Sequence, residues 1–435
     1  MVKVLLRGGR VVDGTGARDA DVLVSDGVVE QVAPGISSPR GAEVLDCAGT
    51  VVCPGFVDLH VHFREPGSSA DETVHTGSRA AALGGYTAVC PMPNTTPAAD
   101  RASVVETVWR RGLEAGLVDV FPIGAITADR AGERLAAMGE MNSSAAQVRM
   151  FSDDGDPVPT AHLMRRAMEY ALIFDAVIVD HAEDPSMRRG HMHEGSVSAA
   201  LGVAGIPAEA EEICVRRDIA LARMTGARLH IAHLTTAGAA EAVREAKREG
   251  LRVTCEVTPH HLALTDESLV SFDTSFKVAP PLRPDGHVQA LKQACADGTV
   301  DAVATDHAPH APYRKDVDFE HAPCGMLGLE TALGVVLTEL VEAGICGVER
   351  VVEMMSIAPA KILGREGHGG PVAEGAAANL VVFDPEHAWT VDPRALSSKS
   401  RNTPFAGRKL KGKVLHTMLR GRFTVRDGLL TEVAG

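Results

Sequence analysis

The sequence is short of aromatic side chains, which make up 4% of its 435 residues. Its core therefore has to be built mainly from Val, Leu, Ile and Ala. No run of 18 apolar residues occurs, so no segment is predicted to span a membrane. The first residues also lack the apolar stretch and cleavage site of a secretory signal peptide.

Basic residues and closely spaced cysteines are scarce as well. The 43 Lys and Arg are outnumbered by 57 Asp and Glu, and the net charge of −14 disfavours nucleic acid or an anionic membrane as a partner. The eight cysteines are scattered, and none forms a C-x-x-C pair. We therefore expect a cytoplasmic protein with reduced thiols.

Short β-branched runs alternate with helical patterns through the middle of the chain. Helices are predicted, among others, at 102–116, 210–225 and 330–343. Strand–helix alternation repeated eight times predicts an α/β fold, specifically a (β/α)₈ TIM-like barrel. The eight predicted strands are 51–61, 87–91, 118–126, 148–151, 176–180, 228–232, 252–257 and 300–305.

Both chain ends contain short strands separated by glycine turns. "LLRGGRVVDG" near the start and "MLRGRFTVRDG" near the end are alike in composition and spacing. We expect the two ends to form one small β-sandwich, with the barrel inserted between them. The predicted domains are 1–54 together with 368–435 for the sandwich, and 55–367 for the barrel.

Histidine and aspartate side chains recur where the predicted strands end. His60 and His62 lie two residues apart on a strand and so face the same side. The carboxyl ends of barrel strands meet at one mouth, where a shared metal would satisfy such groups together. The further candidates are Asp153, Asp154, His181, His230, His233 and Asp306.

This donor set indicates the kind of metal centre. His and Asp ligands without Cys suit Zn²⁺, and less specifically Mn²⁺, Co²⁺ or Fe²⁺. The candidates exceed what one four-coordinate ion needs, so two metals that share a carboxylate are expected. A carboxylated lysine is excluded as the bridge from this region, because no lysine occurs between Lys3 and Lys247.

Several longer motifs agree with one family. They are "PGFVDLHVHFREPG", "GGYTAVCPMPNTTP", "MFSDDG", "HAED", "EVTPHHL", "APPLR", "DGTVDAVATDHAPH" and "NTPF". Together they make the chain resemble the amidohydrolase superfamily and, within it, the dihydroorotases of the bacterial class I type. The resemblance covers nearly the whole chain.

The resemblance implies a role for individual residues. Asp154 would bridge two zinc ions, one held also by His60, His62 and Asp306, the other also by His181 and His233. The implied substrate contacts are His62, Arg64, Asn94, His310, Cys324 and Gly325. Asp153, His230, His260 and His261 would be neighbours of the ligands; the residue pattern alone does not separate them from ligands.

The implied activity is the reversible cyclisation of N-carbamoyl-L-aspartate to L-dihydroorotate in pyrimidine biosynthesis. In the mechanism we hypothesise, a metal-bound hydroxide attacks the cyclic amide and Asp306 carries the proton. An arginine at the pocket mouth, Arg64, favours a substrate with a carboxylate. A homodimer and an association with aspartate carbamoyltransferase stay open.

One residue departs from the family pattern. Ala279 in "KVAPPLR" stands where the family often has Asn, so one substrate hydrogen bond is missing. This departure keeps a hydantoinase or allantoinase open as one alternative. A non-catalytic scaffold is a second alternative, independent of Ala279. Two long segments, 184–207 and 310–325, are predicted to serve the site, the second as a loop that closes on substrate.

Overall fold

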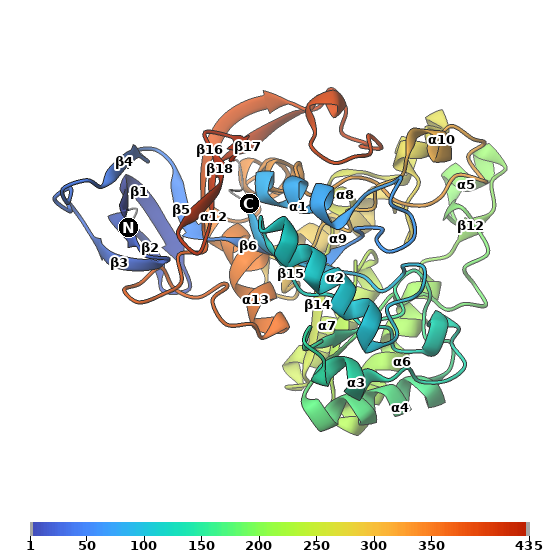
Figure 1. Cartoon of the computed structure of the whole chain (residues 1–435). Helices are drawn as coiled ribbons and strands as arrows, with labels where there is room; N and C mark the ends of the chain where they lie inside the picture. The colour runs from blue at the N-terminus through green and yellow to red at the C-terminus, as the bar shows by residue number, and fades with distance from the viewer. Residues whose placement is uncertain (1–2, 432–435) are drawn as a thin grey trace.

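The computed structural model describes residues 3–431. Both chain ends contribute to one nine-stranded sheet, which lies beside the helical part of the molecule (Figure 1). The order is β19-β18-β17-β16-β5-β1-β2-β3, with β4 paired to β1. The strands are β1 (Lys3–Asp13), β2 (Gly16–Ser25), β3 (Val28–Ala33), β4 (Glu43–Asp46), β5 (Val51–Pro54), β16 (Leu380–Thr390), β17 (Lys409–Leu419), β18 (Arg422–Arg426) and β19 (Leu429–Leu430).

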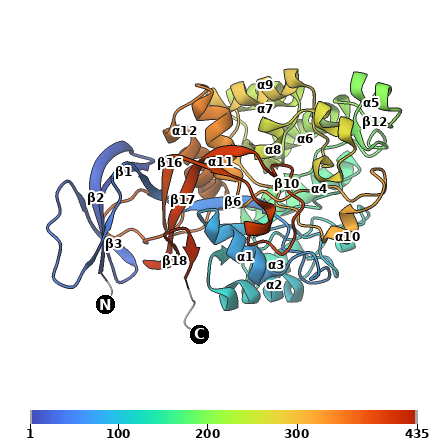
Figure 2. The same ribbon diagram turned by 90° about the horizontal axis from the view of Figure 1, so that it is seen from above.

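Strand β5 is where the two ends of the chain meet. It runs parallel to β1 and antiparallel to β16. One apolar cluster joins Val4 and Leu6 of β1 to Leu380 and Val382 of β16 and to Met418 of β17. Figure 2 shows the N-terminal strands next to β16, β17 and β18. Burial of shared apolar surface thus holds together segments that are far apart in sequence.

The central strands form two parallel sheets. Their orders are β6-β7-β8 and β15-β14-β13-β10-β9. Single parallel bridges link Val61 to His307 and Gly124 to Phe151, at the two places where these sheets adjoin. The strands are β6 (Phe56–Val61), β7 (Tyr86–Pro91), β8 (Asp119–Val120), β9 (Met150–Phe151), β10 (Val177–Asp180), β13 (Arg228–Ile231), β14 (Val253–Val257) and β15 (Ala302–Val303).

The helices pack around these strands. Thr160 and Thr236 cap their helices by accepting hydrogen bonds from Leu163 N and Ala239 N. Gly226 ends α6 with a φ of 75°, a left-handed conformation that favours glycine. The α-helices are α1 (Val74–Leu83), α2 (Ala102–Ala115), α3 (Met138–Ser143), α4 (Ala161–Ala171), α5 (Ser196–Leu201), α6 (Glu209–Thr225), α7 (Ala237–Arg248), α8 (Pro259–Ala263), α9 (Asp285–Ala296), α10 (Pro312–Lys315), α11 (Ala332–Val336), α12 (Val348–Val352) and α13 (Ala358–Leu363).

Short helical turns and two small strands complete the chain. The segment 184–207 carries α5 and the parallel pair β11 (Met192–His193) and β12 (Gly205–Ile206). The turns are η1 (Ala128–Arg130), η2 (Leu172–Phe174), η3 (Asp266–Ser271), η4 (Thr274–Phe276), η5 (Leu337–Glu342), η6 (Glu353–Ile357) and η7 (Pro393–Ala395), of which η5 and η6 are π-helical.

The predicted α/β fold with parallel central strands is confirmed, and several element boundaries differ from the prediction, three of them for the whole element. The run 51–61 is two strands: β5 pairs in the nine-stranded sheet and β6 in a parallel one. The run 118–126 keeps only β8 as a strand, although Phe121 N and Ile123 N beyond it still donate to the carbonyls of Val89 and Pro91. The helix expected at 330–343 begins at Ala332 and continues as the π-helical η5.

No helix of residues 3–431 is both long enough and apolar enough to cross a bilayer.

Candidate metal centre and active site

The predicted ligands lie at the carboxyl ends of the central strands. His60 is on β6, Asp154 follows β9, His181 follows β10 and Asp306 follows β15. Because neighbouring central strands run parallel, these ends meet at one edge. The alternation of side chains on a strand turns the rings of His60 and His62 to the same side.

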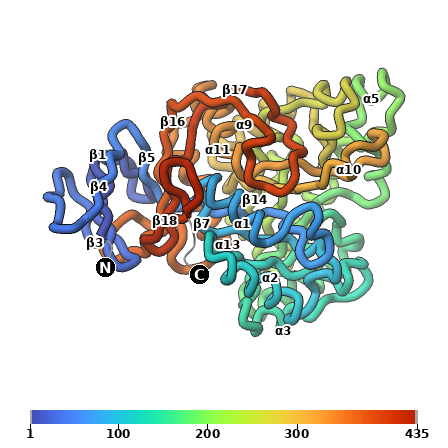
Figure 3. Tube along the Cα trace, turned by 45° about the horizontal axis from the view of Figure 1, so that its top comes forward, coloured from blue at the N-terminus to red at the C-terminus, as the bar shows by residue number. Residues whose placement is uncertain are grey.

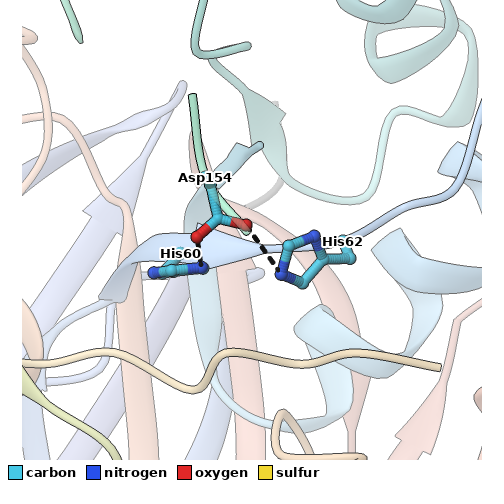
Figure 4. Close-up of side chains that lie close together, drawn as sticks. All are labelled: His60, His62 and Asp154. Atoms are coloured by element: carbon cyan, nitrogen blue, oxygen red, sulfur yellow. Dashed lines mark ion pairs between the residues drawn. The ribbon is translucent and has the colours of Figure 1, made fainter. Parts of the chain in front are cut away.

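The first cluster surrounds one end of Asp154. Oδ1 of Asp154 lies 3.2 Å from His60 Nε2, and Oδ2 lies 3.6 Å from His62 Nε2 (Figure 4). Asp306 Oδ1 adds a second carboxylate, 2.9 Å from His62 Nε2 and 3.5 Å from His60 Nε2. Ligands about 2.1 Å from a tetrahedral zinc ion are separated from one another by roughly 3.4 Å. These spacings suit one ion.

A second cluster shares Asp154. Its Oδ1 lies 3.7 Å from both His181 Nδ1 and His233 Nε2, and those nitrogens are 2.9 Å apart. The donor atoms of Asp154, His181 and His233 all lie within 4.8 Å of one another, as do those of His60, His62 and Asp154. One carboxylate therefore belongs to two adjacent ligand sets.

Burial makes a cation the natural partner of these groups. The side chains of His60, Asp154 and His233 are at most 4% exposed. His60 Nε2 has no hydrogen-bond partner within the part of the chain that the structure describes. A lone pair left unpaired inside a protein is costly, and a metal ion would satisfy it. The residues present thus fit a divalent metal centre.

The charges of the cluster favour ionised carboxylates. Burial alone would raise the pKa of Asp154, but His60, His181 and His233 outweigh it and hold that pKa well below its usual range. For Asp306, the imidazoles of His60 and His62 likewise overcome burial and lower the pKa. Both side chains are therefore carboxylates at neutral pH, the form that binds metal.

Two further carboxylates, to which the sequence analysis gave no role, lie behind the histidines. Glu256 Oε1 is 2.9 Å from His60 Nδ1, and Glu183 Oε2 is 2.9 Å from His181 Nε2. Burial opposes their ionisation, yet the adjacent imidazoles lower the pKa of each to about 2. Such partners fix the tautomer and orientation of a metal-binding histidine. Glu256 lies in the motif "EVTPHHL" and Glu183 in "HAED", and these motifs were the signal in the sequence that could have identified both carboxylates.

The residues left open by the pattern are resolved by their contacts. His230 uses both ring nitrogens, toward Glu256 at 3.1 Å and Thr254 at 2.8 Å. His261 contacts Thr258 at 2.8 Å and the carbonyl of Pro280 at 3.0 Å.

Asp153 accepts hydrogen bonds from the backbone N–H groups of Ile126 and Thr127, each at 2.9 Å. It thereby holds the turn after β8 rather than the metal cluster. His260 is fully buried, and burial lowers its pKa to about 4, so its imidazole is neutral.

A cavity of about 220 Å³ opens beside the metal cluster. All the predicted substrate residues line it: His62, Arg64, Asn94, His310, Cys324 and Gly325. Ala279 lines it too. Arg188, from the long segment 184–207, also lines it, although no pattern in the sequence marked this arginine.

The contacts of these residues join the cavity to the metal cluster. Asn94 Nδ2 donates to Asp154 Oδ2 at 3.0 Å, and Asn94 Oδ1 lies 2.9 Å from His62 Nδ1. Arg64 Nε donates to the carbonyl of Pro309 at 3.1 Å. His310 Nε2 lies 2.8 Å from the carbonyl oxygen of Cys324. A cation, an amide and an imidazole thus face a small cavity next to the metal ligands.

The sequence is similar to several curated dihydroorotases. A family model described as dihydro-orotase-like matches residues 49–239. The dihydroorotase of Streptomyces coelicolor is 52% identical over 432 residues, covering 99% of this chain and 100% of that one. The dihydroorotase of Mycobacterium tuberculosis is 50% identical over 428 residues, covering 98% and 99%.

The titles of solved structures with the same fold name hydantoinases and dihydropyrimidinases. The L-hydantoinase of Arthrobacter aurescens aligns with a TM-score of 0.88 at 26% identity, covering 99% of this chain and 98% of that one. The dihydropyrimidinase of Brevibacillus agri gives 0.84 at 24% identity, covering 99% and 96%. The dihydroorotases are about twice as similar in sequence as these hydantoinase-type proteins.

Proposed function

The chain belongs to the dihydroorotase family, and from this premise we propose how its residues carry out the ring closure of N-carbamoyl-L-aspartate to L-dihydroorotate. The observation that supports the proposal most directly is the sharing of Asp154 between two ligand sets. We assign His60, His62, Asp154 and Asp306 to one metal ion. The second ion would be held by Asp154, His181 and His233.

We propose zinc as the metal, because the donors are imidazole and carboxylate groups without a cysteine. A bound zinc pair would supply a Lewis acid and lower the pKa of water toward neutrality. Glu256 and Glu183 keep Nε2 of His60 and Nδ1 of His181 free as ligand atoms by accepting from the opposite ring nitrogens.

Asp306 is the proposed proton carrier. It is ionised at neutral pH and lies at the cavity wall, so it can accept a proton from the attacking water during ring opening. The bond between the carbonyl carbon and the ring nitrogen then breaks, and Asp306 gives the proton to that nitrogen. In ring closure, the carbamoyl nitrogen attacks the carbon of the protonated side-chain carboxyl group, Asp306 takes up the nitrogen's proton and returns it to the leaving hydroxyl, and the C–O bond breaks to release water.

We propose that one set of cavity residues binds the substrate's α-carboxylate, and we call this set the carboxylate grip. It consists of Arg64, Asn94, His310 and the backbone at Cys324 and Gly325. His62 would contact the reacting end as well as the metal. The guanidinium of Arg64 suits a planar carboxylate. A ring without a carboxylate, such as hydantoin, has no group that these residues could bind in this way. Ala279 adds no side-chain hydrogen bond at its position in the wall.

The two bridges between the parallel sheets support a closed barrel. Val61–His307 and Gly124–Phe151 would join eight strand positions into a ring. We propose residues 55–367 as this barrel and residues 1–54 with 368–435 as the β-sandwich. Residues 1–2 and 432–435 of that division lie outside the described residues.

A cytoplasmic location is proposed because every cysteine is free, Cys324 being exposed. A homodimer and an association with aspartate carbamoyltransferase are also proposed. Light scattering of the chain alone and mixed with that enzyme tests both.

The decisive assay is hydrolysis of L-dihydroorotate before and after chelation, with hydantoin and allantoin in parallel. We expect turnover of dihydroorotate only, lost on chelation and restored by zinc. Turnover of a carboxylate-free ring instead would refute the proposed grip. Inactivity of fully metallated protein on every ring would favour the scaffold alternative.

A further inference from the structure

The "NTPF" motif, residues 402–405, has no role in the proposed chemistry. It lies in the connection between β16 and β17, which leaves the nine-stranded sheet and lies against the helical part of the molecule (Figure 3). Polar contacts fix this connection there. Glu330 Oε1 accepts from Ser397 N at 2.8 Å, and Ser400 Oγ donates to the carbonyl of Asp71 at 2.7 Å.

Asn402, the first residue of the motif, uses its whole side-chain amide. Its Oδ1 accepts from His310 N at 3.0 Å, and its Nδ2 donates to the carbonyls of Ala308 at 3.0 Å and Gly325 at 3.1 Å. Its own carbonyl accepts from Leu327 N at 3.0 Å. Asn402 is 6% exposed, so water does not replace these bonds readily.

These contacts join two segments that run side by side. A parallel bridge pairs His307 with Met326, next to the bonds that Asn402 makes. His310 and Gly325 from these segments line the cavity, whereas Asn402 does not. Asn402 therefore reaches the cavity only through the groups that it holds.

We propose that Asn402 is a positioning residue that fixes the carboxylate-binding side of the substrate cavity. The inference rests on the proposed grip by His310 and Gly325. One acceptor and two donors in a short side chain are what these three partners require. Ionised Asp supplies no donor, and Leu or Ala supplies neither kind of group. A segment from the nine-stranded sheet would thus complete a site built on the central strands.

The test is steady-state kinetics of Asn402→Ala with dihydroorotate and with carbamoyl-aspartate. We expect KM to rise about 10- to 100-fold, with kcat within about fivefold, since a displaced contact to a non-reacting carboxylate weakens ground state and transition state alike. For an analogue with a carboxamide in place of the carboxylate, the ratio of variant to wild-type KM should approach one.

Two neighbours on the same connection provide matched controls. Ser397 Oγ is buried without a hydrogen-bond partner in the described structure, so Ser397→Ala should leave KM unchanged and should not lower the melting temperature. Ser400→Ala removes the contact to Asp71 and should lower the melting temperature at unchanged KM. If Asn402→Ala does not fold, Asn402→Asp keeps the shape and the acceptor, and its KM should rise because the donors are lost.

An unchanged KM in a folded Asn402 variant, or a loss of kcat with KM unchanged, would overturn the inference. Arg64→Ala separates this from the proposed function. If Arg64→Ala raises KM and the Asn402 variants do not, only the positioning role fails. If Arg64→Ala leaves KM unchanged, the carboxylate grip itself is wrong, and the inference falls with it.

Discussion

Replacing Glu256 by Gln should weaken one metal site and spare the other. Glu256 is fully buried and holds the ring of His60 through Nδ1 at 2.9 Å. Gln keeps the shape and one acceptor oxygen but loses the charge. His230 can adapt to the new NH₂ group by changing tautomer, because its other nitrogen faces the Thr254 hydroxyl. His60 cannot adapt, because its Nε2 is needed as the ligand atom.

The size of the effect follows from this asymmetry. A hydrogen bond to a charged group contributes about 1.5–3 kcal/mol, against about 0.5–1.5 kcal/mol for a neutral one. The difference, roughly 1–1.5 kcal/mol, corresponds to about a five- to tenfold weaker affinity for the ion at His60. Glu256→Ala leaves the imidazole N–H unpaired, and the loss should reach about 100-fold.

The assay is competition of each variant with a chelator of known affinity, followed by metal analysis at each stage. Glu183→Gln is the mirror experiment, because Glu183 holds His181 and should affect the second ion instead. Asp119→Asn is the control: it removes the charge of a partly buried carboxylate that lies 3.0 Å from His368, outside the metal cluster. Equal weakening of both ions by Glu256→Gln, or none, would refute the reasoning.

Four other changes follow: three in the site and one at Glu330, the partly buried carboxyl group that holds the connection between β16 and β17. Asp154→Asn removes the shared carboxylate, so both ions should be lost together and kcat should fall at least about 100-fold. Metal analysis and kinetics measure the two effects, and retention of two ions would contradict the bridging role of Asp154. Arg64→Ala should raise KM for dihydroorotate about 100-fold at nearly constant kcat, whereas an unaltered KM would show that another group binds the carboxylate. Ala279→Asn should lower KM about fivefold through one added hydrogen bond, and an increase would mean that the wall has no room for it. Burial raises the pKa of Glu330 from 4.5 to about 7, so the folded chain binds this proton more tightly than the unfolded one. The free energy of unfolding should therefore decline as pH rises from about 4.5 to about 7. In Glu330→Gln, the corresponding fall of the melting temperature with pH should disappear.

Local periodicity was sufficient to predict that the candidate ligands gather in one place, whereas the assignment of each ligand rested on the family resemblance. His60 and His62 share a face through the two-residue repeat of a strand, and the other ligands follow strand ends that any parallel α/β arrangement brings to one edge. The absence of lysine from 4–246 leaves the bridging role to an aspartate. These features need only the order of strands, not their detailed packing.

Tertiary structure decided the roles of residues whose partners are distant in sequence. Glu256 contacts His60 across 196 positions, and Asn402 contacts His310 across 92. Local patterns carry no information about such pairs, because their contacts arise only when separate segments pack together. The same holds for His230, which looks like a ligand on its strand and is instead occupied by Glu256 and Thr254. Local spacing in the sequence thus predicts which residue types gather at the site. The fold determines the hydrogen bonds that hold these residues in place.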